Sequence, residues 1–429
     1  VKVSFQTTHS QQLRTRNADM LSRDEFVGVI TGQGSPAQQA LLGTAHTDWN
    51  DQVFRTGYGT DNNLALSGRL GWFPFRISTG VFYQEGILKE DDLRRFSGNI
   101  SLTPSFFDDH LRLNLNGKST WNDTHWGDTG AIRGASVYNP TWAIYDENSI
   151  FGGYTEVTDI NGNRVTGAQP NPLGRVLQRS DHGKAYRLIG NFDADYRLHM
   201  LPALRLHLTG GYDYAEGRGT VFVPAEAYNN YNISGYDYAY GPQKNHNRLF
   251  TLYANYNKTF DEISSTLDLT TGHDYQFWKS TTAAFEQLNT RGEVQNTSAA
   301  TDQRHALLSY YGRLNYSIAD KYLLTATLRR DGSSRFANDT RWGTFPSVAL
   351  AWRLSNETWF DNLHNVVSDL KIRVSYGVTG QQDGIANYGY IPVYTISQPG
   401  ADYMFGGQPV STYRPEGYNP DLKWETTTS

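Results

Sequence analysis

The sequence predicts an all-β protein, an antiparallel up-and-down β-barrel that crosses a membrane. Apolar and polar residues alternate with a period of two in many segments, which is typical of strands with two different environments. The connections between these segments are alternately short and long. No segment approaches the roughly 20 consecutive apolar residues of a membrane helix. Mean hydropathy is only −0.58, which suits a barrel because only every second residue meets lipid.

Composition narrows the class further. The chain has 429 residues, 14% of them aromatic and only 38% hydrophobic, and all-β barrels of this size can be single domains. It contains no Cys, which is compatible with an oxidising compartment. The net charge is −5 with scattered basic residues, so nucleic-acid binding is not indicated. The first residues already resemble a strand and not a signal peptide, so we expect a processed or partial sequence.

The clearest alternating unit covers residues 321–354. Apolar residues occupy one face of its first segment, and Arg, Asp and Thr occupy the other. After a polar connection the pattern returns, with Leu350 and Trp352 opposite Arg353. The apolar face runs through about ten residues, the length of a tilted strand that crosses a bilayer.

Similar runs recur along the whole chain, and we count thirteen. They cover residues 1–8, 62–70, 76–84, 94–103, 111–121, 185–196, 204–214, 248–258, 263–274, 306–316, 322–331, 346–354 and 369–379. Residues 422–429 resemble the start of a fourteenth. Before the second run, Ser22 and Glu25 have the capping-box spacing that begins a short helix.

The connections predict the orientation of the barrel. Short ones lie at residues 72–75, 104–109, 199–202, 260–262 and 319–320, and long ones at 122–184, 215–247, 275–305 and 332–345. The link 355–368 is longer than the other short ones and is expected to carry a helical turn. Outer-membrane barrels have short periplasmic turns and long extracellular loops.

Within the strands, the alternation assigns side chains to the two solvents. We expect Leu113 and Leu350 to face lipid. The residues expected to face the lumen are Arg112, Asn114, Arg187, Asp193, Asp195 and Arg353.

No enzyme chemistry is indicated. Asp193 and Asp195 are two residues apart and could form an acid–base pair, but polar pairs also line barrel walls, and we favour that interpretation. The His residues lack the local spacing of a metal site, and neither a nucleophile elbow nor a phosphate-binding loop occurs. We therefore expect no catalytic residue, no metal and no cofactor.

Aromatic residues in the expected loops are the candidate ligand-binding residues. The segment 228–241 reads YNNYNISGYDYAYG, and its Tyr rings and amides could bind sugar or peptide. The alternative, an aromatic girdle at the membrane surface, remains open. The candidates are Trp121, Trp126, Trp142, Tyr231, Tyr236 and Tyr238.

Five stretches resemble the SusC/RagA family of TonB-dependent outer-membrane transporters. They are TDWNDQVFRTGYGTDNNLALSG (47–68), QEGILKEDDLRRFSGNISL (84–102), KYLLTATLRRDGSSRFANDTRWGTFPSVALAWRLS (321–355), SDLKIRVSYGVTGQQDGIANYGY (368–390) and YNPDLKWETTTS (418–429). They follow one another in the order found in the family.

The resemblance implies a barrel of about 22 strands with a plug. It also implies import of oligosaccharides or oligopeptides, a SusD-like lipoprotein as lid, and energy from TonB. Neither plug nor TonB box occurs in residues 1–429, so we expect this chain to be part of the barrel domain, with a plug before it and more strands after it. The alternatives are a non-transporting outer-membrane receptor and a secreted glycan-binding or hydrolytic protein. Oligosaccharide is the expected ligand and oligopeptide its main competitor.

Overall fold

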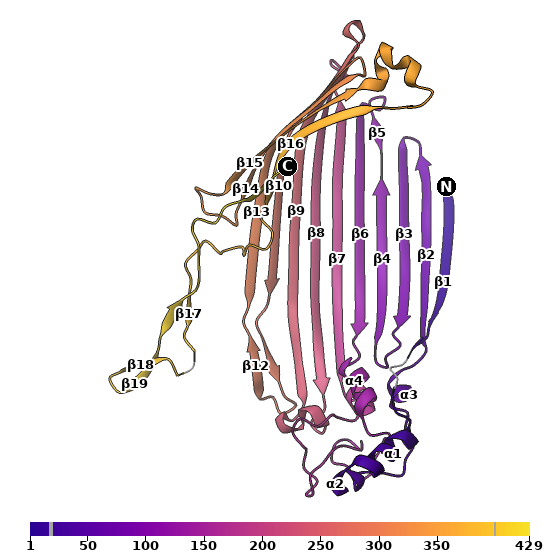
Figure 1. Cartoon of the computed structure of the whole chain (residues 1–429), viewed down its shortest axis with the longest axis vertical. Coiled ribbons are helices and arrows are strands. Elements are labelled where there is room, and N and C mark those ends of the chain that lie inside the picture. Colours follow the sequence, from indigo (N-terminus) through magenta and orange to yellow (C-terminus); the bar gives the residue numbers. More distant parts are fainter. Residues whose placement is uncertain (17–19, 399) are drawn as a thin grey trace.

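The computed structural model describes residues 1–16, 20–398 and 400–429. Most of them form one curved antiparallel sheet of 15 strands (Figure 1). Strands that follow one another along the chain lie side by side, in the order β1-β2-β3-β4-β6-β7-β8-β9-β10-β13-β14-β15-β16-β21, with β5 paired to β6. The predicted up-and-down arrangement is confirmed, and so is the start of a last strand near the C-terminus.

The strands of this sheet are β1 Lys2–Gln12, β2 Gly57–Leu70, β3 Phe73–Glu85, β4 Asp92–Leu102, β5 Ser105–Phe106, β6 Leu111–His125, β7 Ser180–Arg197, β8 Leu204–Val223, β9 Tyr236–Phe260, β10 Ser265–Thr282, β13 Thr301–Ile318, β14 Tyr322–Ser333, β15 Trp342–Arg353, β16 Lys371–Gln381 and β21 Glu425–Thr428. Short hairpins pair β11 Phe285–Leu288 with β12 Val294–Ser298, β17 Tyr394–Ile396 with β20 Tyr413–Pro415, and β18 Asp402–Phe405 with β19 Gln408–Ser411.

The helices are α1 Arg23–Gln33, α2 Pro36–Gln39, α3 Trp49–Val53, α4 Gly130–Val137, α5 Pro172–Leu177 and the 3₁₀ turns η1 Tyr228–Ile233, η2 Asp261–Ile263, η3 Leu354–Asn356 and η4 Thr358–Leu363. The predicted capping box is present, because the Ser22 side chain accepts from the Glu25 N–H and Glu25 accepts from the Ser22 N–H. The helical turn expected in residues 355–368 is η4. Across the described residues, none of the helices has the length and apolar character needed to span a bilayer.

Several strands extend further than the sequence predicts. β9 has 25 residues and β8 has 20, because glycines, tyrosines and amides continue the pairing after the apolar alternation ends. The expected loops 122–184 and 215–247 are therefore wrong in their bounds, and the connections there are residues 126–179 and 224–235.

The two ends of the sheet differ, as predicted. Short turns and the longer link with η3 and η4 lie at one end (Figure 1). The helices α1 to α4 lie at the other, which we call the helix-bearing end. Residues 86–91 form a short connection at the helix-bearing end, between β3 and β4. A small core at that end joins α3, α4 and α5, and its buried residues are Trp49, Val53, Leu88, Ala131, Ala135, Tyr138 and Val176.

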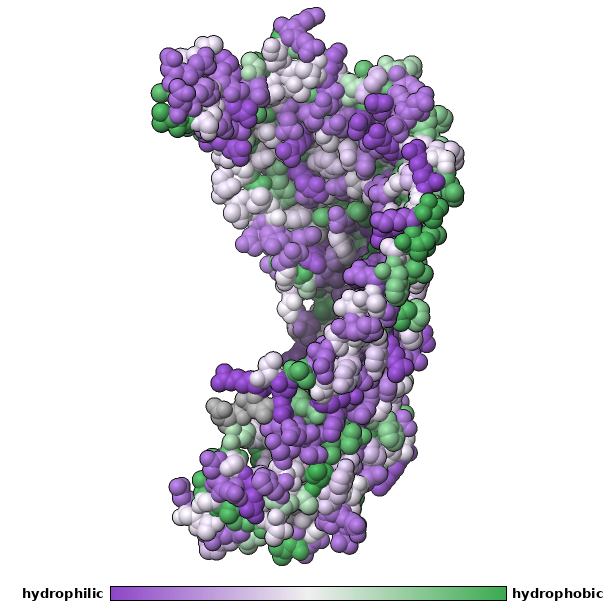
Figure 2. All heavy atoms as spheres, turned by 90° about the vertical axis from the view of Figure 1, so that its right-hand side faces the viewer, coloured by the Kyte–Doolittle hydropathy of each residue, from purple (hydrophilic) through white to green (hydrophobic). Residues whose placement is uncertain are grey.

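The outward face of β15 shows where a bilayer would fit. Trp342 and Trp352 share this face, ten residues apart, with Val348 and Leu350 between them. Their rings stack on Tyr310 and on a tyrosine of β14. Ten residues span about 33 Å along a strand. At the usual tilt of barrel strands this corresponds to about 25 Å across the membrane, which equals the height of the apolar band in such barrels. Figure 2 shows apolar side chains gathered along one margin of the mid-section, between hydrophilic ends.

Candidate functional site: the polar face of the sheet

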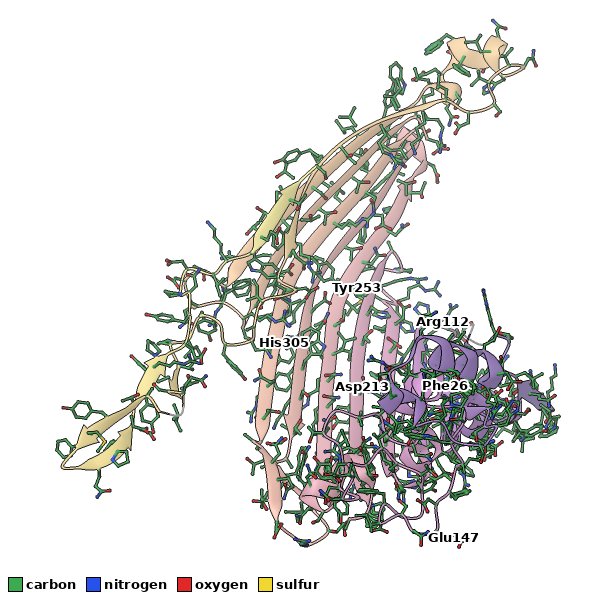
Figure 3. All side chains as sticks on the ribbon, turned by 60° about the horizontal axis from the view of Figure 1, so that its bottom comes forward. Phe26, Arg112, Glu147, Asp213, Tyr253 and His305 are labelled. Carbon is green, nitrogen blue, oxygen red and sulfur yellow. The ribbon has the colours of Figure 1, made fainter. Side chains whose placement is uncertain are left out.

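The opposite face of the sheet is polar, and the six residues predicted to face the lumen all lie on it. Arg112 pairs with Asp195 and Asn114 pairs with Asp193 across β6 and β7. Arg187 lies on the same face of β7 as Asp193 and Asp195, because it is an even number of positions away from each of them. The residue pairing between neighbouring strands continues the polar face from β7 to β15. On β15 this face includes Arg353. In Figure 3 the labelled Arg112 belongs to this face.

Asp193 is part of a hydrogen-bonded network, and Asp195 lies 3.7 Å from both Arg205 and His207. Asp193 accepts from Thr209 Oγ1 and from Asn191 Nδ2, both at 2.7 Å. His207 lies between the two carboxylates, 3.9 Å from Asp193 and 3.7 Å from Asp195. These contacts give both carboxylates polar neighbours on this face of the sheet, and a wall-lining role stays the interpretation that we favour.

Further toward the helix-bearing end, four side chains form a continuous row across four strands. Asp213 of β8 is opposite Asn247 of β9, Asn247 is opposite Trp278 of β10, and Trp278 is opposite His305 of β13. The Trp278 and His305 rings stack, with centroids 4.5 Å apart and planes within 14°. Figure 3 labels Asp213 and His305 on this surface.

A cavity of about 410 Å³ opens over this row, which we call the Trp278 pocket. Its lining residues are Arg187, Asp213, Ala215, Asn245, Asn247, Trp278, Lys279, Ser280, Gln303, His305 and Asn387. Arg187 donates twice to Asp213, with both N–O distances 2.9 Å. Asn387, from the long connection after β16, donates to Gln303 at 3.3 Å. One aromatic platform and several amides thus converge on one cavity, which is typical of a ligand site.

The sequence interpretation missed most of this pocket. It ended the strands near residues 214, 248 and 274, so Trp278, Asn247 and His305 fell in expected loops. The even spacing from Asp274 to Trp278 along β10 would have placed Trp278 on the polar face, had the strand been extended.

A β-bulge brings further aromatic residues to the same face. Between β8 and β9 the register shifts, so Gly217 is opposite Gln243 but Gly219 is opposite Tyr240. One extra residue in β9 reverses its alternation, and Tyr240, Tyr238 and Tyr236 then share the face of Gly219. All three tyrosines were expected within a loop, and this prediction was wrong.

Trp126 lies beside these residues. Gly183 is opposite Gly219, and a side chain at either glycine would collide with an aromatic ring, Trp126 over Gly183 and Tyr240 over Gly219. The two glycines therefore allow the rings to lie against the sheet. Trp126 and Tyr240 form an aromatic surface on the polar face.

The other predicted aromatic residues have different surroundings. Trp121, the last residue of the expected strand 111–121, lies in β6 on the apolar face, opposite Phe96 and Tyr186. Trp142 connects two loops, because its Nε1 donates to the Leu41 carbonyl oxygen at 2.7 Å. Tyr231 is in η1, with its ring centroid 5.0 Å from that of Phe151. The structure does not bring these three together with the Trp278 pocket.

A larger hollow lies on the apolar face. It measures about 720 Å³, and its lining includes Ile100, Leu115, Phe192, Tyr212 and Phe250. The surface is almost entirely apolar and belongs to the face that carries the tryptophans of β15, so it lacks the polar groups that orient a soluble ligand. Among the described residues, no group of three or more His, Cys, Asp or Glu is arranged to hold a metal ion.

Comparison with known proteins identifies the family. Residues 128–429 match the family model described as TonB dependent receptor-like, beta-barrel. The chain belongs to this TonB-dependent receptor family. Such receptors are outer-membrane β-barrels, in agreement with the curved sheet and its apolar face.

Individual TonB-dependent receptors are similar over the whole chain. The TonB-dependent receptor SusC of Bacteroides thetaiotaomicron is 37% identical over 455 residues, covering 100% of this chain and 44% of its own length. Receptor P39 of Formosa agariphila is 30% identical, covering 89% of this chain and 36% of its own length. The chain thus spans less than half the length of these relatives.

The fold is also that of a solved transporter. The RagAB peptide importer in its closed-closed state superposes with a TM-score of 0.74 at 19% identity, over 99% of this chain and 51% of that one. The resemblance to SusC- and RagA-type transporters inferred from the sequence is confirmed.

Proposed function

We propose that this chain is part of the barrel wall of a transporter that imports oligosaccharides across the bacterial outer membrane, driven by TonB. The observation that carries the proposal is the amphipathic sheet, with a ligand-sized polar pocket on one face and an apolar band on the other. The 37% identity to SusC along the entire chain supports transport as the use of this wall. The polar face would line the lumen, and no chemical step is assigned to it.

The remaining barrel and a plug would come from other parts of the full-length protein. Among the residues that the structure describes, β1 is paired on one side only, with β2, and an open strand edge is not stable in lipid. A plugged lumen does not let a large ligand diffuse through, and the outer membrane has no ATP, so energy must come from elsewhere. TonB, which names this family, is the proposed source, acting on the plug.

A SusD-like lipoprotein is the proposed partner at the extracellular mouth. The helix-bearing end would be outside the cell, because barrels of this kind have long extracellular loops and short periplasmic turns. The loop core around Trp49 and Tyr138 gives that end a packed surface. Loops on a rigid scaffold are where partners usually bind.

Oligopeptide import is the second candidate, suggested by the RagAB peptide importer. That similarity is at 19% identity, so it supports the shared fold more than a shared ligand. The stacked Trp278 and the surrounding amides favour saccharide, since aromatic faces suit the apolar faces of sugar rings.

Uptake by whole cells tests the proposal. Cells with the full-length transporter should accumulate fluorescently labelled neutral oligosaccharides, and cells lacking the transporter or TonB should not. A SusD-like lipoprotein should co-purify with the tagged transporter from the outer membrane. Accumulation independent of TonB would contradict the transport mechanism, and TonB-dependent accumulation of peptides alone would establish the second candidate.

A further inference from the structure

The cations that line the Trp278 pocket each lie near a carboxylate. Arg187 forms two hydrogen bonds with Asp213, and Lys279 lies 3.6 Å from Asp302. Arg335, near His305, lies 3.7 Å from Asp383. Arg187 and Lys279 are the Arg and Lys side chains among the lining residues, and each therefore has a carboxylate partner. Asp302 also pairs with Arg304.

We propose that this pocket is a subsite for one uncharged sugar unit, and that the Arg187–Asp213 pair makes it discriminate against anionic saccharides such as uronates. The inference rests on the proposed import function and specifies its substrate class. It assigns recognition to Trp278 and to the amides around it, and selectivity to Asp213.

Trp278 has one ring face available for a sugar. His305 covers the face toward β13, because the two rings stack across neighbouring strands. The other face is on the side of β9, above Asn247. The cavity extends in that direction over Ala215 and Asn245. A pyranose ring placed there would cover the indole with its apolar C–H groups.

Hydrogen-bonding groups surround the same space. Asn247 uses its Nδ2 on Asp213, at 3.3 Å, which leaves its carbonyl oxygen to accept from a hydroxyl. Asn245 and the amide nitrogen of Gln303 add further groups. Asn387 closes this side of the pocket, because it donates to Gln303 and accepts from Arg335. The volume of about 410 Å³ falls within the range of small-molecule sites, roughly 300–1,000 Å³.

The ion pair explains the expected selectivity. An anionic ligand gains most from a cation that has no other partner, as in bidentate contacts between Arg and a carboxylate. Asp213 already accepts hydrogen bonds from two N–H groups of the Arg187 guanidinium. A uronate would have to displace Asp213 or sit beside its negative charge, and like charges in contact are costly. A neutral sugar meets neither obstacle.

Matched ligands test the proposal with the purified full-length transporter. Hexamers of galacturonan and of polymannuronate are each compared with their carboxyl-reduced forms, which differ only at C6. We expect at least one reduced hexamer to bind the wild type at least tenfold more tightly than its acid. Equal or tighter binding of the acid in both pairs, or no binding of any form, would overturn the proposal.

Variants separate recognition from charge selection. Trp278→Ala should weaken binding of the neutral form at least tenfold, and Phe277→Ala, on the opposite face of β10, should leave it unchanged. Asp213→Asn releases Arg187 and should increase affinity for the acid at least tenfold. The double variant Arg187→Gln/Asp213→Asn lacks the cation and should not show this gain, which controls for a general loosening of the wall.

The outcomes also distinguish the subsite from the proposed function. If cells import the neutral saccharide through TonB but Trp278→Ala and Asp213→Asn bind all four ligands like the wild type, transport stands and the subsite is wrong. If cells import only peptides, the saccharide function fails together with its subsite.

Discussion

Val348 and Ser347 are adjacent in β15 but belong to opposite faces of the sheet. Val348 lies between the two outward tryptophans of the strand, near the middle of the apolar band, and Ser347 lies on the polar face. Val348→Arg would place a charge in lipid, at a cost of about 2–4 kcal/mol at the midplane. We expect reduced assembly into the outer membrane, measured as the folded fraction in membrane extracts.

Ser347→Arg is the matched control and should assemble close to the wild-type level. Leu113 lies near the start of β6, at the short-turn end, so arginine there should cost only about 0–1 kcal/mol, as near the interfaces of barrels. Equal assembly of Val348→Arg and Ser347→Arg would contradict the assignment of the two faces.

Glu156 is a partly buried carboxyl in the long loop between β6 and β7. Burial raises its pKa to about 8, although it accepts a hydrogen bond from the Asn171 N–H at 2.8 Å and lies near Tyr138 and Arg164. The folded loop therefore binds a proton that the unfolded loop releases near pH 4.5. The stability of the loop should fall as pH rises from about 4.5 to 8 and then level off.

Hydrogen exchange of residues 138–171 at pH 5 and pH 8 measures this effect, after correction for intrinsic exchange rates. Protection should be greater at pH 5 in the wild type and independent of pH in Glu156→Gln. Asp159→Asn is a control in the same loop. Hydrogen bonds from Asn163 hold the pKa of Asp159 below its usual value, so this carboxyl is ionised at both pH 5 and pH 8. The variant should therefore keep the pH dependence of the wild type. If the wild-type loop has the same protection at both pH values, the raised pKa of Glu156 does not contribute to loop stability.

At the scale of elements, the loop core is predicted to fold separately from the strands. Trp49 of α3 is buried, with its ring 4.9 Å from that of Tyr138 and its Nε1 donating to the Asn139 carbonyl oxygen at 2.9 Å. Trp49→Ala should cost about 3–5 kcal/mol, as for other buried tryptophans. Protease should then cut residues 126–179 while the barrel remains assembled.

Trp72→Ala is the comparison, since Trp72 is exposed in the turn between β2 and β3. It should leave the loop resistant to protease. If Trp49→Ala prevents barrel assembly altogether, the loop core and the sheet are one cooperative unit.

The elements also show how far the sequence could predict the structure. Alternation depends on neighbouring residues, so it assigned Arg112 and Leu113 to opposite faces correctly. It could not locate strand ends where pairing continues without apolar residues, as in β9. The row from Asp213 to His305 depends on the register of four strands, and the position of Tyr238 depends on one extra residue in a bulge. Both are set by pairing between distant segments, which no local pattern contains.

For the whole molecule, cysteine labelling tests the orientation. Ile160 and Met200 are both almost fully exposed and lie at opposite ends of the sheet, in the long loop after β6 and in the turn after β7. With an impermeant maleimide on intact cells, Ile160→Cys should react and Met200→Cys should not. The reverse pattern would mean that the helix-bearing end faces the periplasm.

The most direct test of the central claim, that the polar face is the inner wall along which a saccharide passes, is a cryo-EM structure of the full-length transporter with a bound neutral oligosaccharide. We predict that the polar face encloses the lumen, that Val348 and Leu350 contact the detergent belt, and that a sugar ring stacks on Trp278. A polar face turned toward the detergent, or a ligand bound without contact to this wall, would contradict it.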